Sequence, residues 1–240
     1  MVTSRVGATV GLQVDPRGLL LETGLFDHVP HAQVDALVAH APVRHFAADE
    51  VLLDCHSNGD YLRLLLTGVA KLHTTSASGA EVILSVLHPG ELFGEESLLD
   101  DVARVSVVTG ILPTSVLLVH RRDLDALPGQ TALYRGLAQL MVRRVRLAES
   151  RHATMLSADS QQRIVRGLLD LAAGFARPGL PARYVALPIR QRDLAAMTGV
   201  ARETANRALT TLEVAGAVAM TSRQAITVDP ARLRAWLRDT

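Results

Sequence analysis

Residues 131 to 157 form an uninterrupted, helix-compatible stretch that limits the folds open to this chain. This stretch holds no proline and a single glycine, Gly136, so one helix of about 27 residues, roughly 40 Å long, can form there. Apolar positions recur along it at steps of three and four, with one irregular step. They are Tyr134, Leu137, Met141, Val145, Ala148, His152 and Met155. Such a narrow seam has the spacing of a coiled coil, and we expect a parallel homodimer.

Two kinds of surface could cover this seam: the β-rich part of the same chain, or the same helix of a second subunit. Arginines flank the seam, and a face that packs inside a globular domain would be wider, which favours the second subunit. The flanking arginines are Arg135, Arg143, Arg144, Arg146 and Arg151. The predicted dimer contacts are Leu137, Met141, Val145, Ala148, His152 and Met155.

Before the long helix, the sequence has a different period. Short amphipathic helical segments are expected between residues 19 and 43. After them come short β-branched or leucine-rich segments, separated by turn signals such as Ser57-Asn58-Gly59-Asp60 and Pro89-Gly90. The expected strand segments are 50–54, 61–66, 69–74, 81–87 and 103–120. Strands at about 10-residue spacing indicate a β-sandwich or a barrel.

Charge is sorted along the chain, although its 25 basic and 24 acidic residues nearly cancel. Residues 1–130 carry a net charge of −8 and residues 131–240 one of +9, an asymmetry that suggests contact between the C-terminal part and a polyanion. One cysteine, Cys55, excludes an intramolecular disulfide and any metal site built on several cysteines of one chain. No apolar run is long enough to span a bilayer or to serve as a secretory signal, so we expect a cytoplasmic protein.

The C-terminal sequence predicts a winged helix-turn-helix. A short helix begins at Gln191, Gly199 lies in a tight turn, and a second helix runs from Ala201 to about Ala215. Small residues, among them Ala195 and Ala205, permit a close crossing of the two helices. Segments 217–220 and 225–228 form a hairpin that serves as the wing.

One exposed face of the second helix carries polar side chains suited to base edges. Arginine suits guanine, glutamate accepts from the amino group of cytosine, and asparagine can pair with adenine. The alternative is an ordinary solvated helix face with an Arg–Glu pair, and the turn, the wing and a net charge of +6 over residues 160–240 argue against it. The predicted DNA contacts are Arg202, Glu203, Asn206, Arg207, Arg223 and Arg190.

Residues 198–207, Thr-Gly-Val-Ala-Arg-Glu-Thr-Ala-Asn-Arg, resemble the Gly-x-Ser-Arg-Glu-Thr-Val-x-Arg recognition helix of the CRP/FNR superfamily of bacterial transcription regulators. Ala201 and Ala205 replace the serine and the valine of that motif. The resemblance covers roughly residues 19–238. It implies that Arg202, Glu203 and Arg207 read a TGTGA-like half-site, that two half-sites form a palindrome in double-stranded DNA, and that RNA polymerase is a partner.

The acidic half contains the run Gly90-Glu91-Leu92-Phe93-Gly94-Glu95-Glu96-Ser97-Leu98-Leu99, followed by Arg104. A glycine turn before a short helix presents N–H groups to an anion. Glu95 could accept a hydroxyl proton while Arg104 holds a phosphate in a bidentate way, although a structural Arg–Glu pair would leave the same pattern. The run is similar to the phosphate-binding cassette of cyclic-nucleotide-binding domains. The resemblance implies that Glu95 binds a ribose 2′-hydroxyl and Arg104 the cyclic phosphate.

The predicted ligand is cyclic AMP, and the predicted ligand-binding residues are Gly94, Glu95, Glu96, Ser97, Arg104, Val105 and Glu149. The chain departs from the cassette at Val105, where members that respond to cyclic AMP often have serine or alanine. It also has Ala148 and Glu149 where one family member contacts adenine through a Thr-Ser pair. Three alternatives remain open: a dimer that needs no ligand, a haem- or redox-responsive regulator that uses His73 or Cys55, and a cyclic-nucleotide module that acts on a protein partner.

These observations together predict an α+β chain in four parts. Residues 1–18 are a mobile tail, 19–130 a β-roll sensor domain of the cyclic-nucleotide-binding type, 131–158 a dimerisation helix and hinge, and 159–240 a winged helix-turn-helix domain. The sequence shows no nucleophile–base constellation, no metal-ligand spacing and no phosphate-binding P-loop. We therefore expect a DNA-binding regulator, not an enzyme.

Overall fold

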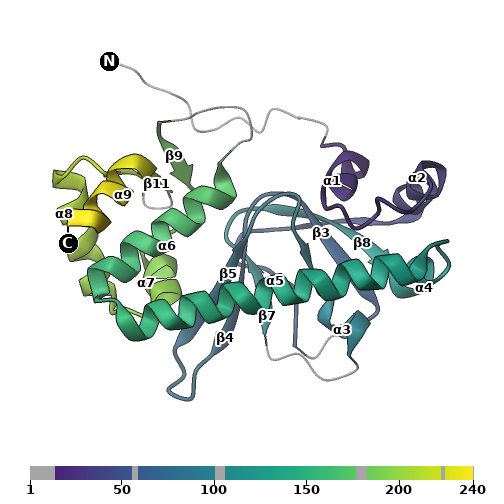
Figure 1. Cartoon of the computed structure of the whole chain (residues 1–240), viewed down its shortest axis with the longest axis horizontal. Helices are drawn as coiled ribbons and strands as arrows, with labels where there is room; N and C mark the ends of the chain where they lie inside the picture. The colour runs from purple at the N-terminus through teal and green to yellow at the C-terminus, as the bar shows by residue number, and fades with distance from the viewer. Residues whose placement is uncertain (1–13, 56–58, 101–105, 177–182, 223–224, 240) are drawn as a thin grey trace.

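A computed structural model describes residues 14–55, 59–100, 106–176, 183–222 and 225–239 of the chain. An antiparallel β unit comes first, one long helix runs along it, and a mainly helical unit with a small sheet follows (Figure 1). The predicted α+β class is confirmed. Within these described ranges, no helix combines the length and the apolar character that crossing a membrane requires.

The strands described in the N-terminal unit form two antiparallel four-stranded sheets, with the orders β1-β8-β3-β6 and β2-β7-β4-β5. The strands are β1 Val43–Phe46, β2 Val51–Leu53, β3 Tyr61–Thr67, β4 Ala70–Thr75, β5 Glu81–Leu87, β6 Leu92–Phe93, β7 Val107–Gly110 and β8 Thr114–His120. Four short helices accompany them: α1 Pro16–Glu22, α2 His31–His40, α3 Glu96–Leu99 and α4 Arg121–Asp125. Buried side chains from both sheets, including Leu65, Phe93 and Val108, make a common core between them.

Three sequence predictions need correction at element boundaries. Helix α1 begins at Pro16, where the Asp15 side chain accepts a hydrogen bond from the Arg17 N–H at 3.0 Å, so the last residues of the predicted 1–18 tail are helical. Val43 is the first residue of β1, which pairs with β8, and not the end of a helical segment. The predicted strand 103–120 is two strands, because the chain turns at Leu112-Pro113 between β7 and β8.

Helix α5, Gln130–Ser157, is one unbroken helix of 28 residues. Leu133 and Leu137 near its start are fully buried in the core of the β unit, with Leu62, Leu64 and Leu117. The beginning of α5 therefore lies on its own domain, as the first of the two alternatives for the seam proposed. The prediction that Leu137 is a dimer contact is wrong, because its side chain is already enclosed within the subunit.

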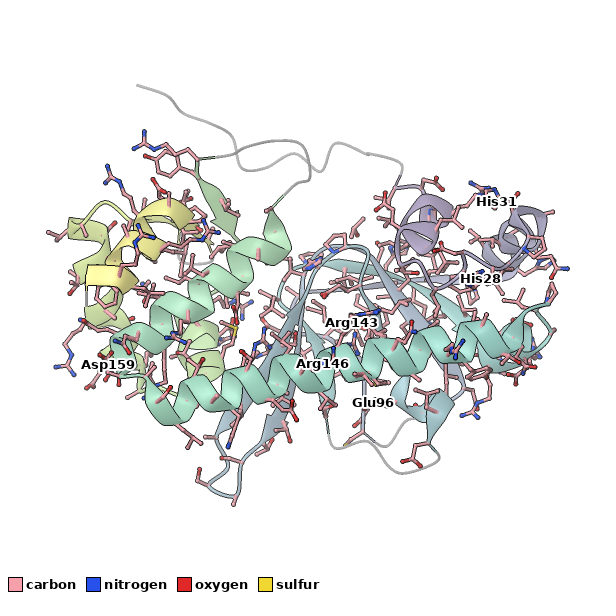
Figure 2. All side chains as sticks on the ribbon, in the orientation of Figure 1. His28, His31, Glu96, Arg143, Arg146 and Asp159 are labelled. Carbon is pink, nitrogen blue, oxygen red and sulfur yellow. The ribbon has the colours of Figure 1, made fainter. Side chains whose placement is uncertain are left out.

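The C-terminal unit contains α6 Ser160–Phe175, β9 Val185–Leu187, α7 Gln191–Thr198, α8 Arg202–Val214, β10 Val218–Ser222, β11 Ala225–Val228 and α9 Pro230–Asp239. Asp159 caps α6 by accepting from the Gln162 N–H at 2.9 Å, and Figure 2 labels it where the chain turns from α5 into α6. Gly199 ends α7 in the left-handed conformation, with φ 63°. Strands β10 and β11 form the predicted hairpin, and β9 extends it to a three-stranded sheet.

The two units share one apolar cluster. Val69, Ile83, Val86 and Ile111 of the β unit belong to the same buried core as the helices α6, α7 and α8. An ion cluster lies beside it: Lys71 on β4 donates to Glu81 on β5 at 2.6 Å and lies 3.4 Å from the Asp193 carboxylate on α7. The C-terminal unit is thus docked on the β unit in this structure.

Candidate ligand and DNA-binding sites

The buried carboxylate of Glu95 is the centre of the candidate ligand site. Glu95 is fully buried at the start of α3, immediately after Gly94. Gly94 has a φ of 78°, and a Cβ atom there would lie 2.7 Å from the Arg63 guanidinium, so this close turn favours glycine. The local sequence therefore turns the chain sharply and directs the glutamate into the interior.

Arg144 of α5 is the partner of Glu95. Its Nη1 donates to Glu95 Oε1 and its Nη2 donates to the Leu92 carbonyl. The other carboxylate oxygen, Oε2, is buried and has no hydrogen-bond partner among the described residues. Burial raises the pKa of Glu95 above its usual value, and Arg144 offsets part of that rise. One oxygen of a buried carboxylate is left able to accept a hydroxyl proton.

The remaining predicted ligand residues lie in different places. Ser97 is buried, and its hydroxyl donates to the Gly94 carbonyl at 3.3 Å. Glu96 is exposed on α3, on the side of α5 opposite to Arg143 (Figure 2). Glu149 is also exposed and lies about 140° around the helix from Arg144, so within one subunit it does not join the Glu95 site. Arg104 and Val105 lie outside the described residues.

Arg144 is not among the ligand-binding residues that the sequence predicts. The available signal was its spacing: Arg144 lies seven residues, or two helical turns, after the buried Leu137 and therefore shares its face of α5. A hollow of about 400 Å³ borders this arginine, between the α1–α2 connection, residues 90–92 and α5. Arg143 also lines the hollow.

The second helix of the predicted helix-turn-helix is α8. Arg202, Glu203 and Arg207 are exposed at its start. Asn206 is half-buried and its amide oxygen is enclosed, with no partner in the part of the chain that the structure describes. Its predicted contact with adenine thus rests on an amide that faces partly inward. Arg223 lies outside the described residues.

Arg190, which precedes α7, contacts the β unit in this structure. It holds the Asp49 carboxylate in a bidentate way, with Nη1–Oδ1 at 2.8 Å and Nη2–Oδ2 at 3.1 Å. The hydrogen bond to Arg190 lowers the pKa of Asp49, and the same bond raises the pKa of Arg190. The predicted DNA contact at Arg190 is therefore engaged within the chain.

The later part of α5 presents apolar side chains to solvent. Val145 is 57% exposed and Met155 39%, Met141 is half-buried, and Ala148 and His152 are exposed. Leu156, beside this strip, is 77% exposed. Apart from Leu137, the predicted dimer contacts are thus accessible on a single chain. We call Met141, Val145, Ala148, His152 and Met155 the seam strip.

His73, one conceivable haem ligand, has partners within the β unit. Its Nε2 lies 2.9 Å from the Thr109 hydroxyl, and its Nδ1 lies 3.4 Å from Glu81. Burial lowers the pKa of His73, which favours the neutral ring. The histidine therefore belongs to the polar cluster that Lys71 and Glu81 form near the domain interface.

Comparisons with known proteins agree with this architecture. Residues 43–130 match a family model described as a cyclic nucleotide-binding domain, and residues 162–236 match a Crp-like helix-turn-helix domain. The "Cyclic AMP receptor protein" of Thermus thermophilus is 32% identical over 81% of this chain and 87% of its own. The "CRP-like cAMP-activated global transcriptional regulator" of Mycobacterium tuberculosis is 25% identical over 90% of this chain and 96% of its own. The structure of FixK2 from Bradyrhizobium japonicum has the same fold, with a TM-score of 0.69 and 24% identity over 81% of this chain and 96% of its own.

The fold and these matches define a class: a transcription regulator with a cyclic-nucleotide-binding domain and a DNA-binding helix-turn-helix domain. The chain belongs to the CRP/FNR family. The resemblance found in residues 198–207 is thereby confirmed. The relative from Mycobacterium tuberculosis is named as a transcriptional regulator, and neither family model describes a catalytic domain.

Proposed function

We propose that this protein is a homodimeric, sequence-specific regulator whose affinity for DNA is modulated by cyclic AMP bound in the β unit. The observation that carries the proposal is the buried Glu95, which shares one oxygen with Arg144 and leaves the other free. Arg144 belongs to α5, the helix that also carries the seam strip. A ligand hydroxyl that donates to Glu95 would therefore change the contact between Glu95 and Arg144, and through Arg144 it would act on α5.

Cyclic AMP is favoured among anions because it combines the two groups that the cassette would recognise. Its ribose 2′-hydroxyl suits the free oxygen of Glu95, and its cyclic phosphate suits Arg104, which follows nine residues later in the sequence. Two relatives of this chain are named for cyclic AMP. Ala148 and Glu149 stand where one family member contacts adenine, so the adenine contacts of this chain differ from those of that member. Val105 departs from the pattern directly after the phosphate-binding Arg104.

Calorimetry tests the ligand. Cyclic AMP titrated into the wild type should release heat, and Glu95→Gln should weaken binding by about 10- to 100-fold, the value of a hydrogen bond to a charged group. Arg104→Ala should weaken it further. Glu22→Gln, an exposed change on α1, is the matched control and should bind like the wild type. If the wild type gives no heat with cyclic AMP, the ligand is removed from the proposal and a ligand-independent regulator remains, in which Arg144 alone satisfies Glu95.

The seam strip supports the homodimer, because the free energy falls when a second helix covers exposed apolar side chains at coiled-coil spacing. Val145→Glu should produce a monomer in analytical ultracentrifugation at micromolar concentration. Val214→Glu is the matched control, since Val214 is 87% exposed at the end of α8 and outside the strip. A Val145→Glu protein that sediments as the wild type does would contradict the proposed interface.

For DNA, Arg202, Glu203 and Arg207 are proposed to read a TGTGA-like half-site, with two half-sites in one palindrome. In a dimer the two recognition helices must lie about 34 Å apart, one turn of the duplex. RNA polymerase is the proposed partner on promoter DNA. Selection from random oligonucleotides should return a palindromic site, and a selection without enrichment would support a protein-partner function instead.

A further inference from the structure

The contact between the β1–β2 turn and the start of α7 contains groups of the kind that bind DNA phosphates. Besides Arg190, Arg192 approaches Asp49, with Arg192 Nη2 3.5 Å from Asp49 Oδ1. Both arginines lie at the N-terminal end of α7, where free backbone N–H groups and the helix dipole also favour an anion. Arginines and helix N-termini are common phosphate contacts in protein–DNA complexes.

The surroundings of Asp49 belong to the DNA-binding surface. Asp49 lines a hollow of about 720 Å³ together with the two arginines, with Arg202 at the start of α8, and with Met220 and Ser222 on the wing. The recognition helix, the start of α7 and the wing thus converge on a space that contains a carboxylate from the other unit. A DNA backbone that used this space would have to displace that carboxylate.

The turn that presents Asp49 is held in place. Asp49 has a φ of 64° in the left-handed region, and its N–H donates to the Gly110 carbonyl at 2.8 Å. Aspartate and asparagine tolerate this backbone conformation better than other non-glycine residues. The carboxylate therefore points to the arginines from a turn that is pinned to β7.

A bidentate carboxylate satisfies the guanidinium fork in the same way as a phosphate does. Resting on the proposed DNA binding, we propose that Asp49 acts as an internal stand-in for a DNA phosphate. The docked arrangement is an autoinhibited state in which Asp49 occupies Arg190 and Arg192 and blocks the hollow next to Arg202. DNA binding then requires the β1–β2 turn to release these arginines.

The test is the affinity of the ligand-free, full-length protein for DNA, measured by fluorescence anisotropy with a duplex that carries a TGTGA-like palindrome. Asp49→Asn removes the charge and keeps a residue that suits the left-handed turn. Its affinity should rise about fivefold, equivalent to about 1 kcal/mol, because a larger share of molecules then has free arginines. The same gain is expected on a random duplex of equal length, since phosphate contacts do not depend on sequence.

Asp27→Asn is the matched control. Asp27 is exposed in the segment that joins α1 and α2. Both helices lie at the end of the β unit far from the C-terminal unit (Figure 1). The Asp27→Asn variant loses the same charge as Asp49→Asn, and its affinity for DNA should remain within twofold of the wild type. In an Arg190→Ala background, Asp49→Asn should gain less than twofold, because only the longer contact to Arg192 is left to release.

The outcomes separate the two proposals. If the wild type binds the palindrome selectively and Asp49→Asn has the same affinity, the proposal that Asp49 replaces a phosphate is wrong. The proposed function then still holds. An equal gain in affinity for Asp27→Asn also contradicts the proposal, because the gain would then come from the change in net charge. If no variant binds DNA, the proposed function fails and the stand-in fails with it. Thermal melting that matches the wild type shows that Asp49→Asn is folded.

Discussion

Lys71 is the residue whose replacement tests the domain interface most directly. It is the single lysine of the chain, its side chain is 8% exposed, and it lies between Glu81 on the same sheet and Asp193 on α7. Asp193 is only 2% exposed, and its Oδ2 has no partner among the described residues. Lys71→Met keeps the length and the apolar stem of the side chain but leaves this buried carboxylate without its nearest cation.

The expected cost follows from this geometry. Removing one partner of a buried ion pair costs about 3–5 kcal/mol, and the lower end applies because Glu81 is 38% exposed and regains contact with water. A cost of about 3 kcal/mol lowers the urea midpoint by about 1 M if the slope is about 3 kcal/mol per M. The double variant Lys71→Met/Asp193→Asn removes both charges and should recover most of the loss.

Urea unfolding followed by the fluorescence of Trp236 measures this effect, because Trp236 on α9 is the single tryptophan and reports on the C-terminal unit. Glu22→Gln on the surface of α1 should leave the midpoint unchanged. A change below about 0.5 kcal/mol for Lys71→Met, the range of ordinary surface substitutions, would refute the structural role of the ion cluster. A double variant less stable than Lys71→Met alone would refute the charge argument.

Three further predictions concern the site, a turn and the recognition helix. Because the pKa of Glu95 is raised above 4.5 in the folded state, the folded protein binds more protons than the unfolded one above that pH. The contribution of Glu95 to stability therefore falls as pH rises through that window, and thermal melting from pH 4 to 8 should show a flatter profile for Glu95→Gln. An identical profile would contradict the raised pKa. Gly68→Ala should destabilise by more than about 1 kcal/mol, since its φ is 84° and a Cβ would lie 2.2 Å from the Pro113 carbonyl oxygen. Gly79→Ala, at a φ of 81° with open space around the Cβ position, is its control in the same thermal melts. Equal losses of stability in the two variants would show that the clash with Pro113 contributes nothing. Arg202→Ala should cost about 1–3 kcal/mol of discrimination between cognate and mismatched duplexes in a gel shift, whereas an equal loss on all sequences would make it a phosphate contact.

Local patterns predicted most of the architecture. The Pro-free stretch became α5, Gly199 ended α7, and the β-hairpin formed between Val218 and Val228. Each depends on residues close in sequence, where backbone preference and periodicity act directly. The small strand β9 and the first strand β1 were missed, because three or four residues carry too short a pattern to separate a strand from its surroundings.

Contacts between distant residues were less accessible. Glu95 was identified from its cassette, but its partner Arg144 is 49 residues away, and the pairing depends on how α5 lies on the β unit. Leu137 fits the seam by spacing alone and is nevertheless buried in its own subunit. A helical period gives the direction of a side chain around the axis, and it does not say which surface that direction meets.

The order of the parts, the family and the identity of the chemical groups can all be read from contiguous residues such as 93–99 and 198–207. Which of those groups pair with one another depends on the tertiary structure. It brings Asp49 to Arg190 across 141 positions and Lys71 to Asp193 across 122. Pairings at such separations arise from the packing of two units against each other, and in this chain that packing pairs opposite charges of the two halves.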